Sequence, residues 1–514
     1  MTNRLAADVL ICGAGAAGLT LAIDLARRGI SFRLIDKAAD PFPGSRGKGI
    51  QPRTQEIFED LGVLDKAVAA GGRYPPQRTY HDDGSVTDAA MAEPAEPTPA
   101  EPYQMPLMVP QFVTERLLRD RLSEFGVDVE AGRTLVGFEQ DGDGVTARIT
   151  SAEGTETLRV GWLIGADGGR SFVRHALGIA FPGHTLGVRA IVADVALEGL
   201  SRGLAHRFAR GGAMSEQVSI TPLAGTDLFQ IQGPVPMDGD VDLTATGLTA
   251  LLARRTGRDD IAVRSVAWAS AYEMSARLAE RYRAGRVLLV GDAAHVHPPT
   301  GGQGLNTSVQ DAYNLGFKLA AVIAGAGDDI LATYEAERRP VAEDMLRLAT
   351  RLLDAQTQGA MRRGREVRQL DIGYRGSPLT VEALDRRRGL RAGDRAPDAR
   401  LHGAAGQPSR LFHLFKGPHW TLLVQAGGHG AIAPRANLHI HVIGPAGDIL
   451  DTSGDIAAAY GLAPGECALV RPDGYVGAIL GADDTAALDA YFPALGVVAH
   501  PARPVTTTEV SPHG

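Results

Sequence analysis

The feature that most constrains the fold is a glycine cluster near the start of the chain, Gly13-Ala-Gly15-Ala-Ala-Gly18. An apolar run over 8–12 precedes it, and apolar residues recur at four-residue spacing over 16–28, which predicts a strand followed by a helix. A second apolar run over 31–35 predicts a parallel strand. In such a βαβ unit the glycines permit a tight turn and let a pyrophosphate approach the helix N-terminus. We therefore expect an α/β fold that binds a dinucleotide.

Asp36 supports this prediction, because it stands at the end of the second predicted strand. It follows Gly15 by 21 residues, the distance at which a carboxylate in this unit accepts hydrogen bonds from ribose hydroxyls. A purely structural glycine turn is the alternative, but it explains neither the flanking elements nor Asp36.

Composition narrows the class of protein. The 514 residues are 44% hydrophobic and 22% charged, as in a globular protein of several domains. A net charge of -8 argues against nucleic acid or an anionic membrane as partner and favours a small molecule. Cys12 and Cys467 are too few for a disulfide framework, which favours the cytoplasm. The apolar stretch over 9–26 contains Asp24 and several glycines, so we expect neither a signal peptide nor a membrane span.

Two acidic motifs follow further predicted strands. One runs from Gly165 through Asp167 to Arg174, and the other is Gly291-Asp292-Ala-Ala-His295. Each puts an acid at the carboxyl end of a strand, where open α/β sheets bind ligands. Asp292 would repel a phosphate, so a polyol hydroxyl such as that of a ribityl chain is its expected partner. This favours FAD over NAD.

The segment Pro298-Pro-Thr-Gly-Gly-Gln-Gly304-Leu-Asn306 predicts contact with a flat ring. Its prolines stiffen the entry, its glycines let the backbone approach closely, and a long helix is expected to start there. The positive end of that helix would stabilise an anionic reduced flavin by about 1 kcal/mol, or about 2 when partly buried.

A basic loop precedes these motifs in the chain. It contains Arg46, Lys48 and Arg53, and the flanking Gly44, Gly47 and Gly49 favour a mobile loop that contacts a ligand over a solvated basic edge. His295 and His297 could suggest a metal pair, but no third ligand lies at a useful spacing. No metal is expected.

Together the three motifs resemble those of class A FAD-dependent aromatic hydroxylases, of the para-hydroxybenzoate and phenol hydroxylase type. The resemblance covers about residues 7 to 345. Residues 393–480, with Arg471-Pro-Asp-Gly-Tyr475, are similar to the thioredoxin-like tail of the larger members, which act on phenols and polyketide antibiotics. No C-x-x-C is present, so dithiol chemistry is not expected from this tail.

The resemblance implies a monooxygenase that uses FAD, NADPH or NADH, and O2 to hydroxylate a phenolic substrate through a flavin C4a-hydroperoxide. The separate tail favours a bulky polycyclic or antibiotic-like phenol, in biosynthesis or in resistance. Two alternatives stay open: a hydroxylase of a small phenolic acid in aromatic catabolism, and a flavin-bound protein that sequesters a drug without turnover. A monomer or a homodimer is expected.

The implied site residues fall into three groups. Those expected to bind the cofactor are Gly13, Gly15, Ala17, Gly18, Asp36, Lys37, Arg46, Gln111, Asp167, Asp292, Gly304, Leu305 and Asn306. The backbone of Pro298, Gly301 and Gly302 is expected to shape the oxygen site. The substrate candidates are Gln217, Phe229, Gln230, Trp268 and Pro299.

The expected organisation has four parts. Residues 1–180 and 281–345 form a Rossmann-like FAD-binding domain, with a proline-rich surface loop over 79–102. Residues 181–280 form an antiparallel β-sheet domain for the substrate, 346–390 a helical linker, and 391–514 a C-terminal thioredoxin-like domain.

Overall fold

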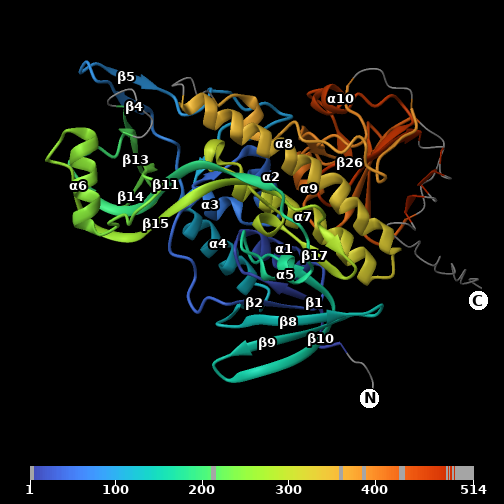
Figure 1. Cartoon of the computed structure of the whole chain (residues 1–514). Coiled ribbons are helices and arrows are strands. Elements are labelled where there is room, and N and C mark those ends of the chain that lie inside the picture. The colour runs from blue at the N-terminus through green and yellow to red at the C-terminus, as the bar shows by residue number, and fades with distance from the viewer. Residues whose placement is uncertain are drawn as a thin grey trace, which may run out of the picture.

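The computed structural model describes residues 5–209, 216–357, 363–384, 389–427 and 434–481, together with 484, 487, 488, 491 and 492. Three large sheets organise the chain. In Figure 1 the first sheet lies below the centre, the second to the left and the C-terminal one at the upper right. No helix in these ranges is both long and apolar enough to cross a membrane.

The first sheet carries the predicted βαβ unit. Its main path is β16-β17-β10-β1-β2-β7, and β8 and β9 extend it through β10. The strands are β1 (Ala7–Cys12), β2 (Phe32–Asp36), β7 (Glu130–Ala131), β8 (Thr134–Gln140), β9 (Val145–Ser151), β10 (Gly154–Gly165), β16 (Arg283–Ala284) and β17 (Val287–Leu289). Strands β2, β1, β10 and β17 are parallel, so Asp36, Cys12, Gly165 and Leu289 end at one edge. Helix α1 (Ala16–Arg27) packs against α4 (Gln111–Ser123) and α7 (Gly304–Ile323).

The glycine turn is fixed by backbone contacts that exclude side chains. Gly13 has a φ of 109°, and a Cβ there would lie 2.3 Å from the carbonyl oxygen of Ala166. A Cβ on Gly18 would lie 1.9 Å from the carbonyl oxygen of Gly13. The bounds of β1, α1 and β2 differ from the predicted ones by at most one residue, because this unit is specified by local periodicity and glycine chemistry.

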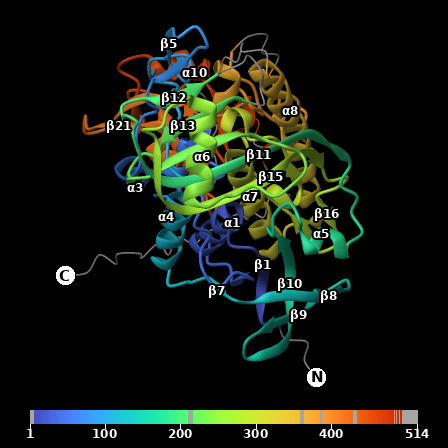
Figure 2. The same ribbon diagram turned by 60° about the vertical axis from the view of Figure 1, so that its left-hand side comes forward.

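The second sheet has the order β18-β15-β11-β14-β13-β12-β4-β5. Its strands are β4 (Gln77–Tyr80), β5 (Val86–Ala89), β11 (Gly183–Glu198), β12 (Ala205–Phe208), β13 (Val218–Pro222), β14 (Phe229–Val235), β15 (Ala262–Leu278) and β18 (His295–Val296). All pairs are antiparallel except β4 with β12. Figure 2 shows α6 (Ala245–Thr256) lying across this sheet, where its leucines join a separate apolar core.

The surface loop predicted over 79–102 is wrong in its first part. The chain there forms the hairpin of β4 and β5, which extends the second sheet. The prolines that suggested a loop begin only at Pro94, after the hairpin, and the turn before β5 is fixed by Asp83, whose carboxylate accepts hydrogen bonds from Ser85. The short strands β3 (Gly49–Ile50) and β6 (Leu107–Met108) pair separately.

The remaining helices are α2 (Pro52–Asp60), α3 (Leu64–Ala70), α5 (Phe172–Ala176), α8 (Ala332–Thr357), α9 (Leu411–Phe415) and α10 (Asp455–Tyr460). Single 3-10 turns lie at Gly291–Ala293, Thr300–Gly302, Asp328–Leu331 and Arg365–Arg368. The helical linker predicted over 346–390 is therefore only partly helical. Gly364 is extended, with a ψ of -156°, so the turn at Arg365–Arg368 does not continue a helix.

The C-terminal sheet has the order β19-β26-β25-β22-β23-β24-β20-β21. Its strands are β19 (Val381–Glu382), β20 (Arg400–Gly403), β21 (Pro408–Arg410), β22 (Trp420–Gln425), β23 (Leu438–Ile443), β24 (Ile449–Leu450), β25 (Glu466–Val470) and β26 (Val476–Gly481). Strand β19 thus belongs to this sheet although it lies within the predicted linker. Residues 493–514 of the predicted C-terminal domain lie outside the described residues.

A buried cluster of charges joins the C-terminal sheet to the body. Arg471 forms ion pairs at 2.8 Å with Glu337 of α8 and at 2.6 Å with Asp473, and Lys318 of α7 lies 2.7 Å from Glu337. All four side chains are almost completely buried. We call these four residues the charge cluster.

Candidate functional site

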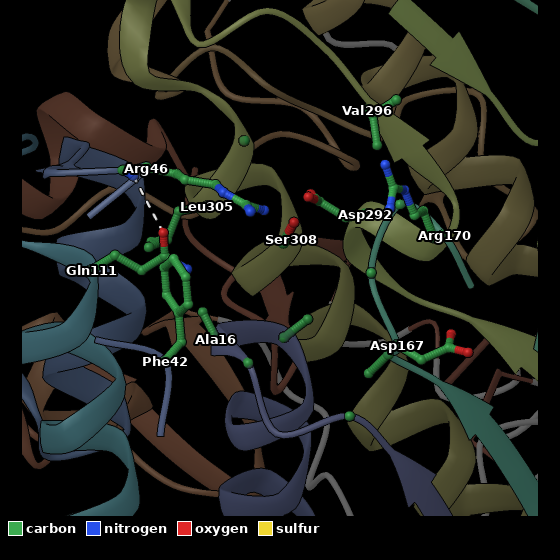
Figure 3. A pocket seen from close by; sticks show the side chains of 18 of the residues that line it. Ala16, Phe42, Arg46, Gln111, Asp167, Arg170, Asp292, Val296, Leu305 and Ser308 are labelled. Carbon is green, nitrogen blue, oxygen red and sulfur yellow. Dashed lines mark hydrogen bonds between the residues drawn. The ribbon is translucent and has the colours of Figure 1, made fainter. Parts of the chain in front are cut away.

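A cavity of about 2390 Å³ opens where the parallel strands of the first sheet end. Its wall combines the glycine turn after β1, the ends of β2 and β10, the first turn of α7, and residues 270–275 of β15. The cavity therefore lies between the first and the second sheet. Figure 3 shows side chains from these separate segments facing one another across it.

One end of the cavity is built from the glycine turn. Gly13, Gly15, Ala17, Asp36 and Lys37 line it. Asp36 accepts hydrogen bonds from the backbone N–H of Ala14 at 2.7 Å and of Ala38 at 2.9 Å, one on each oxygen. Because a carboxylate oxygen accepts two hydrogen bonds, Asp36 fixes the turn and keeps acceptor capacity for ribose hydroxyls. Gly18 does not line the cavity, since its role is to pack the helix against the turn.

The start of α1 is suited to an anion. The N–H of Ala16 interacts with Glu115, but no side chain of the N-cap residue caps the helix, so the next N–H groups of the first turn stay available. A Cβ on Gly15 would find only Glu115 within 4 Å, at 3.8 Å, so the space before this glycine is open. Burial raises the pKa of Glu115, the carboxyl that lies next to this open space. An open glycine cradle in front of a helix N-terminus fits the pyrophosphate of a dinucleotide.

Arg46 and Gln111 lie on the opposite wall. Gln111 accepts a hydrogen bond from the backbone N–H of Gly47 and donates one to Glu115 at 2.9 Å. The guanidinium of Arg46 stands 5.4 Å from the ring centre of Phe42 and 5.8 Å from that of Trp268. Figure 3 shows this guanidinium extending across the cavity towards Asp292.

The two acidic motifs differ in what their carboxylates contact. Asp292 is exposed and points into the cavity (Figure 3), where it can accept hydrogen bonds from hydroxyl groups. Asp167 also lines the cavity, but its carboxylate points away from the centre and accepts a hydrogen bond from the N–H of Val173 at the start of α5. Asp167 thus fixes the backbone that carries Arg170, whose side chain lies beside Val296.

The far end of the cavity is formed by the turn before α7. Pro298, Pro299, Gly302, Gly304 and Leu305 line it. Gly302 has a φ of 65°, which favours glycine, and α7 starts without a side-chain cap. Backbone N–H groups are therefore presented at this wall, as the contact with an anionic ring requires.

Two predicted residues of this segment do not line the cavity. A Cβ on Gly301 would lie 2.7 Å from Leu352, so this glycine faces the protein interior. Asn306 is completely buried, and its amide donates to the carbonyls of Gly49 and Gly302 and accepts from the N–H of Gln51, each at 2.8 Å. Asn306 ties the basic loop to the turn and does not face a ligand.

The substrate candidates divide in the same way. Pro299 lines the cavity, and Trp268 stands behind Phe42 and Arg46. Gln230 is buried and does not line the cavity itself, but it accepts a hydrogen bond at 2.7 Å from Lys48, which does. Phe229 and Gln217 do not belong to the wall: Phe229 packs in the apolar core under α6, and Gln217 accepts a hydrogen bond from Arg207. For these two residues the substrate role is wrong.

Comparison with known proteins identifies the family. Residues 6–349 match the FAD binding domain family, and residues 390–494 match the aromatic-ring hydroxylase C-terminal family. The chain belongs to the FAD-dependent aromatic-ring hydroxylases. It is an FAD-dependent monooxygenase, and enzymes of this class take electrons from NADPH or NADH and oxygen from O2.

Individual relatives agree with this assignment. A flavin-dependent monooxygenase of Mycobacteroides abscessus is 44% identical over 91% of this chain and 96% of its own. A rifampicin monooxygenase of Rhodococcus hoagii is 34% identical over 91% of this chain and 94% of its own. The solved structure of aklavinone-11 hydroxylase with FAD and aklavinone covers 96% of this chain and 99% of its own, with 28% identity and a TM-score of 0.83.

The hydroxylase also has wall residues that were not predicted as site residues. Tyr272, Met274 and Arg277 of β15 line the cavity. All residues over 270–275 line the cavity, although side chains of a strand normally alternate between its two faces. The alternating pattern of the sequence therefore could not have identified these wall residues. Of the basic loop, Arg46 and Lys48 line the cavity, whereas Arg53 is buried and paired with Glu56 at 2.7 Å.

The histidines of the hydroxylase motif have structural partners. His295 bonds to Asp311 at 2.6 Å, and Asp311 also pairs with Arg338 at 2.7 Å, all buried. Opposite charge from His295 and Arg338 outweighs burial and lowers the pKa of Asp311. Among the described residues, no cluster of three metal-ligating side chains occurs. His295 thus anchors the motif to α7 and α8.

Proposed function

We propose that this monooxygenase hydroxylates a bulky, polycyclic phenol of the kind found in antibiotics. The observation that carries the proposal is the size of the cavity, about 2390 Å³, against about 300–1000 Å³ for a typical small-molecule pocket. A cavity of this size accommodates FAD and a large second ligand. Relatives named for rifampicin and for anhydrotetracycline, and a neighbour solved with aklavinone, support the same substrate class.

The FAD would be held by the residues described above. Gly13, Gly15, Asp36 and Lys37 would contact its adenosine and pyrophosphate half, Arg46, Gln111 and Asp292 its ribityl region, and the backbone of Gly304 and Leu305 its ring. Bound there, the flavin supplies the transfer of electrons from the nicotinamide and the activation of O2. The chain itself orients the phenol, excludes water and stabilises negative charge with the first turn of α7.

Ligand-stimulated oxidation of NADPH tests the substrate class. Anhydrotetracycline, rifampicin and 2-hydroxyanthraquinone would be compared with para-hydroxybenzoate, with NADH in parallel. We expect the polycyclic phenols to accelerate NADPH oxidation and to give products heavier by about 16 mass units, one oxygen atom. Stimulation by para-hydroxybenzoate alone would favour a small-acid hydroxylase, and binding without oxygen transfer would favour drug sequestration.

We further propose that the C-terminal part is a thioredoxin-like domain without dithiol activity. The run β23-β22-β25-β26 supports this: its first pair is parallel, and the next two pairs are antiparallel. The sequence has only two cysteines, and Cys467 is buried in β25. A substrate-binding domain over 181–280, a cytoplasmic location and a monomeric or homodimeric state stay predictions.

A further inference from the structure

Lys48 occupies a special position at the junction of the two sheets. It lies on the basic loop, lines the cavity, and is flanked by residues that contact the first turn of α7. A Cβ on Gly47 would lie 3.7 Å from Leu305, and the carbonyl of Gly49 accepts the hydrogen bond from Asn306. Lys48 is therefore attached to the same turn that faces the flavin ring.

The side chain of Lys48 is held by the second sheet. Its Nζ donates to Oε1 of Gln230 on β14 at 2.7 Å. The amide of Gln230 in turn donates to Ser45 Oγ at 2.7 Å, and Ser45 Oγ donates to Asp194 of β11 at 2.7 Å. This chain of buried hydrogen bonds fixes Gln230, so the direction of the lysine is set from behind the wall.

The charges around Lys48 do not neutralise it. Within the described part of the chain, no carboxylate forms an ion pair with Lys48, and Nζ has two further N–H groups to donate when protonated. Burial and the positive charge of Arg363 lower the pKa of Lys48 to about 7, against the weaker effect of Asp194. Tyr74, which also faces Arg363, stays neutral because burial raises its pKa to about 12.

We propose that Lys48 binds the phenolic oxygen of the aromatic substrate and takes up its proton. The O–H bond of the phenol breaks, its electron pair stays on oxygen, and the proton forms a new N–H bond on the neutral amine. The products are an ammonium group and a phenolate at its side, and no further reactant is needed. The inference rests on the proposed function.

This arrangement has a direct chemical use. An ionised phenol is richer in electrons, which favours attack on an electrophilic oxygen, and its anion would supply the counter-charge that Lys48 lacks. The substrate is thereby specified as an aromatic compound with a free acidic hydroxyl at the end of the cavity near β14.

The spectrum of a bound dye tests the role of Lys48 without turnover. The probe is 2-hydroxyanthraquinone, whose phenol and phenolate differ in colour, added to the oxidised FAD-loaded enzyme without NADPH. In the wild type we expect the bound dye to ionise at least one pH unit lower than the free dye. In Lys48→Met this shift should disappear. Lys48→Arg should restore the shift by charge alone, because its guanidinium is a permanent cation that takes up no proton.

Two controls separate charge from folding. Lys66→Met removes an exposed lysine that pairs with Glu124 and does not line the cavity, and it should leave the ionisation of the dye unchanged. In the wild type, 2-methoxyanthraquinone, which cannot ionise, should bind at least tenfold more weakly than 2-hydroxyanthraquinone above about pH 7. This second measurement needs no variant and stays informative if Lys48→Met fails to fold.

The outcomes distinguish the two proposals. The role of Lys48 is overturned if the wild type binds both dyes equally and the bound hydroxy dye ionises at the same pH as the free dye in water. An unchanged ionisation in a folded Lys48→Met enzyme overturns it as well. If the wild type binds neither dye and no polycyclic phenol stimulates NADPH oxidation, the proposed function itself fails.

Discussion

The two ends of the cavity are built in different ways. At the end near Gly15 the wall is backbone, supplied by one stretch of about 25 residues that includes a helix N-terminus and Asp36. At the end near Lys48 the wall is assembled from side chains that are far apart in sequence, such as Lys48 and Gln230, 182 residues apart. The first end suits a ligand common to all members of the family, and the second suits a substrate that differs between them.

The largest effects are expected at two glycines of the first end, where one substitution should prevent folding and the other should weaken FAD binding. Gly18→Val places atoms into the carbonyl of Gly13, so we expect loss of the folded protein. Gly15→Val projects into open space, so we expect a folded protein whose FAD affinity falls by about 100-fold or more, equivalent to about 2.7 kcal/mol. Circular dichroism and flavin content after gel filtration measure both. Tight flavin binding by Gly15→Val would contradict the pyrophosphate assignment.

Asn306 tests whether the second end depends on buried connections. Asn306→Ala leaves the N–H of Gln51 and the carbonyls of Gly49 and Gly302 without their partner, which should cost about 2 kcal/mol of unfolding free energy. Chemical denaturation measures this loss. Ser308→Ala, at a wall residue on the same helix, serves as the control and should cost much less. Equal stability of the two variants would show that Asn306 is not a connector.

Asp292 lies between the two ends of the cavity, and Asp292→Ala should have a moderate effect on FAD affinity. The exposed carboxylate faces the cavity, so its loss should weaken FAD binding by about tenfold, or about 1.4 kcal/mol, without a change in thermal stability. Fluorescence titration of the apoenzyme with FAD measures the affinity. Undiminished affinity would remove Asp292 from the ribityl site.

The pH dependence of hydroxylation tests the role of Lys48 at the second end of the cavity. Because the pKa of Lys48 is lowered to about 7, its neutral form increases as pH rises through that value, and so should the single-turnover rate of product formation. In Lys48→Met the rate should no longer rise with pH near 7. If the same rise persists in that variant, it belongs to the titration of another group.

The smallest effect is expected at the residues that the structure removes from the site. Gln217→Met and Phe229→Leu should leave the KM for the phenol within about twofold, since both side chains are directed away from the cavity. Phe229→Leu should lower stability by about 1 kcal/mol through imperfect repacking. Steady-state kinetics and thermal melting measure the two quantities.

The sequence was sufficient where the interactions are local. Gly13, Gly15 and Asp36 are specified within one βαβ unit, and their spacing follows from the length of a helix and a strand. Asp292 and the turn at Pro298 were also predictable, because each directly follows a predicted strand or precedes a predicted helix.

The sequence was insufficient where two faces of a sheet are both covered. Phe229 and Gln230 are neighbours on β14, and alternation says that they face opposite sides, but not which side carries α6 and which the basic loop. The hairpin of β4 and β5 was missed for a related reason, since β12, the strand that pairs with it, follows more than 100 residues later. Such pairings are set by tertiary packing.

The charge cluster has a consequence for protein engineering. Helix α7 begins at the cavity wall and, four turns later, presents Lys318 to Glu337, whose carboxylate also pairs with Arg471 of the C-terminal part. A chimera that exchanges only the C-terminal part between two hydroxylases would leave buried ions unmatched on this helix. Functional exchange of that part therefore requires transplanting Lys318 and Glu337 along with it.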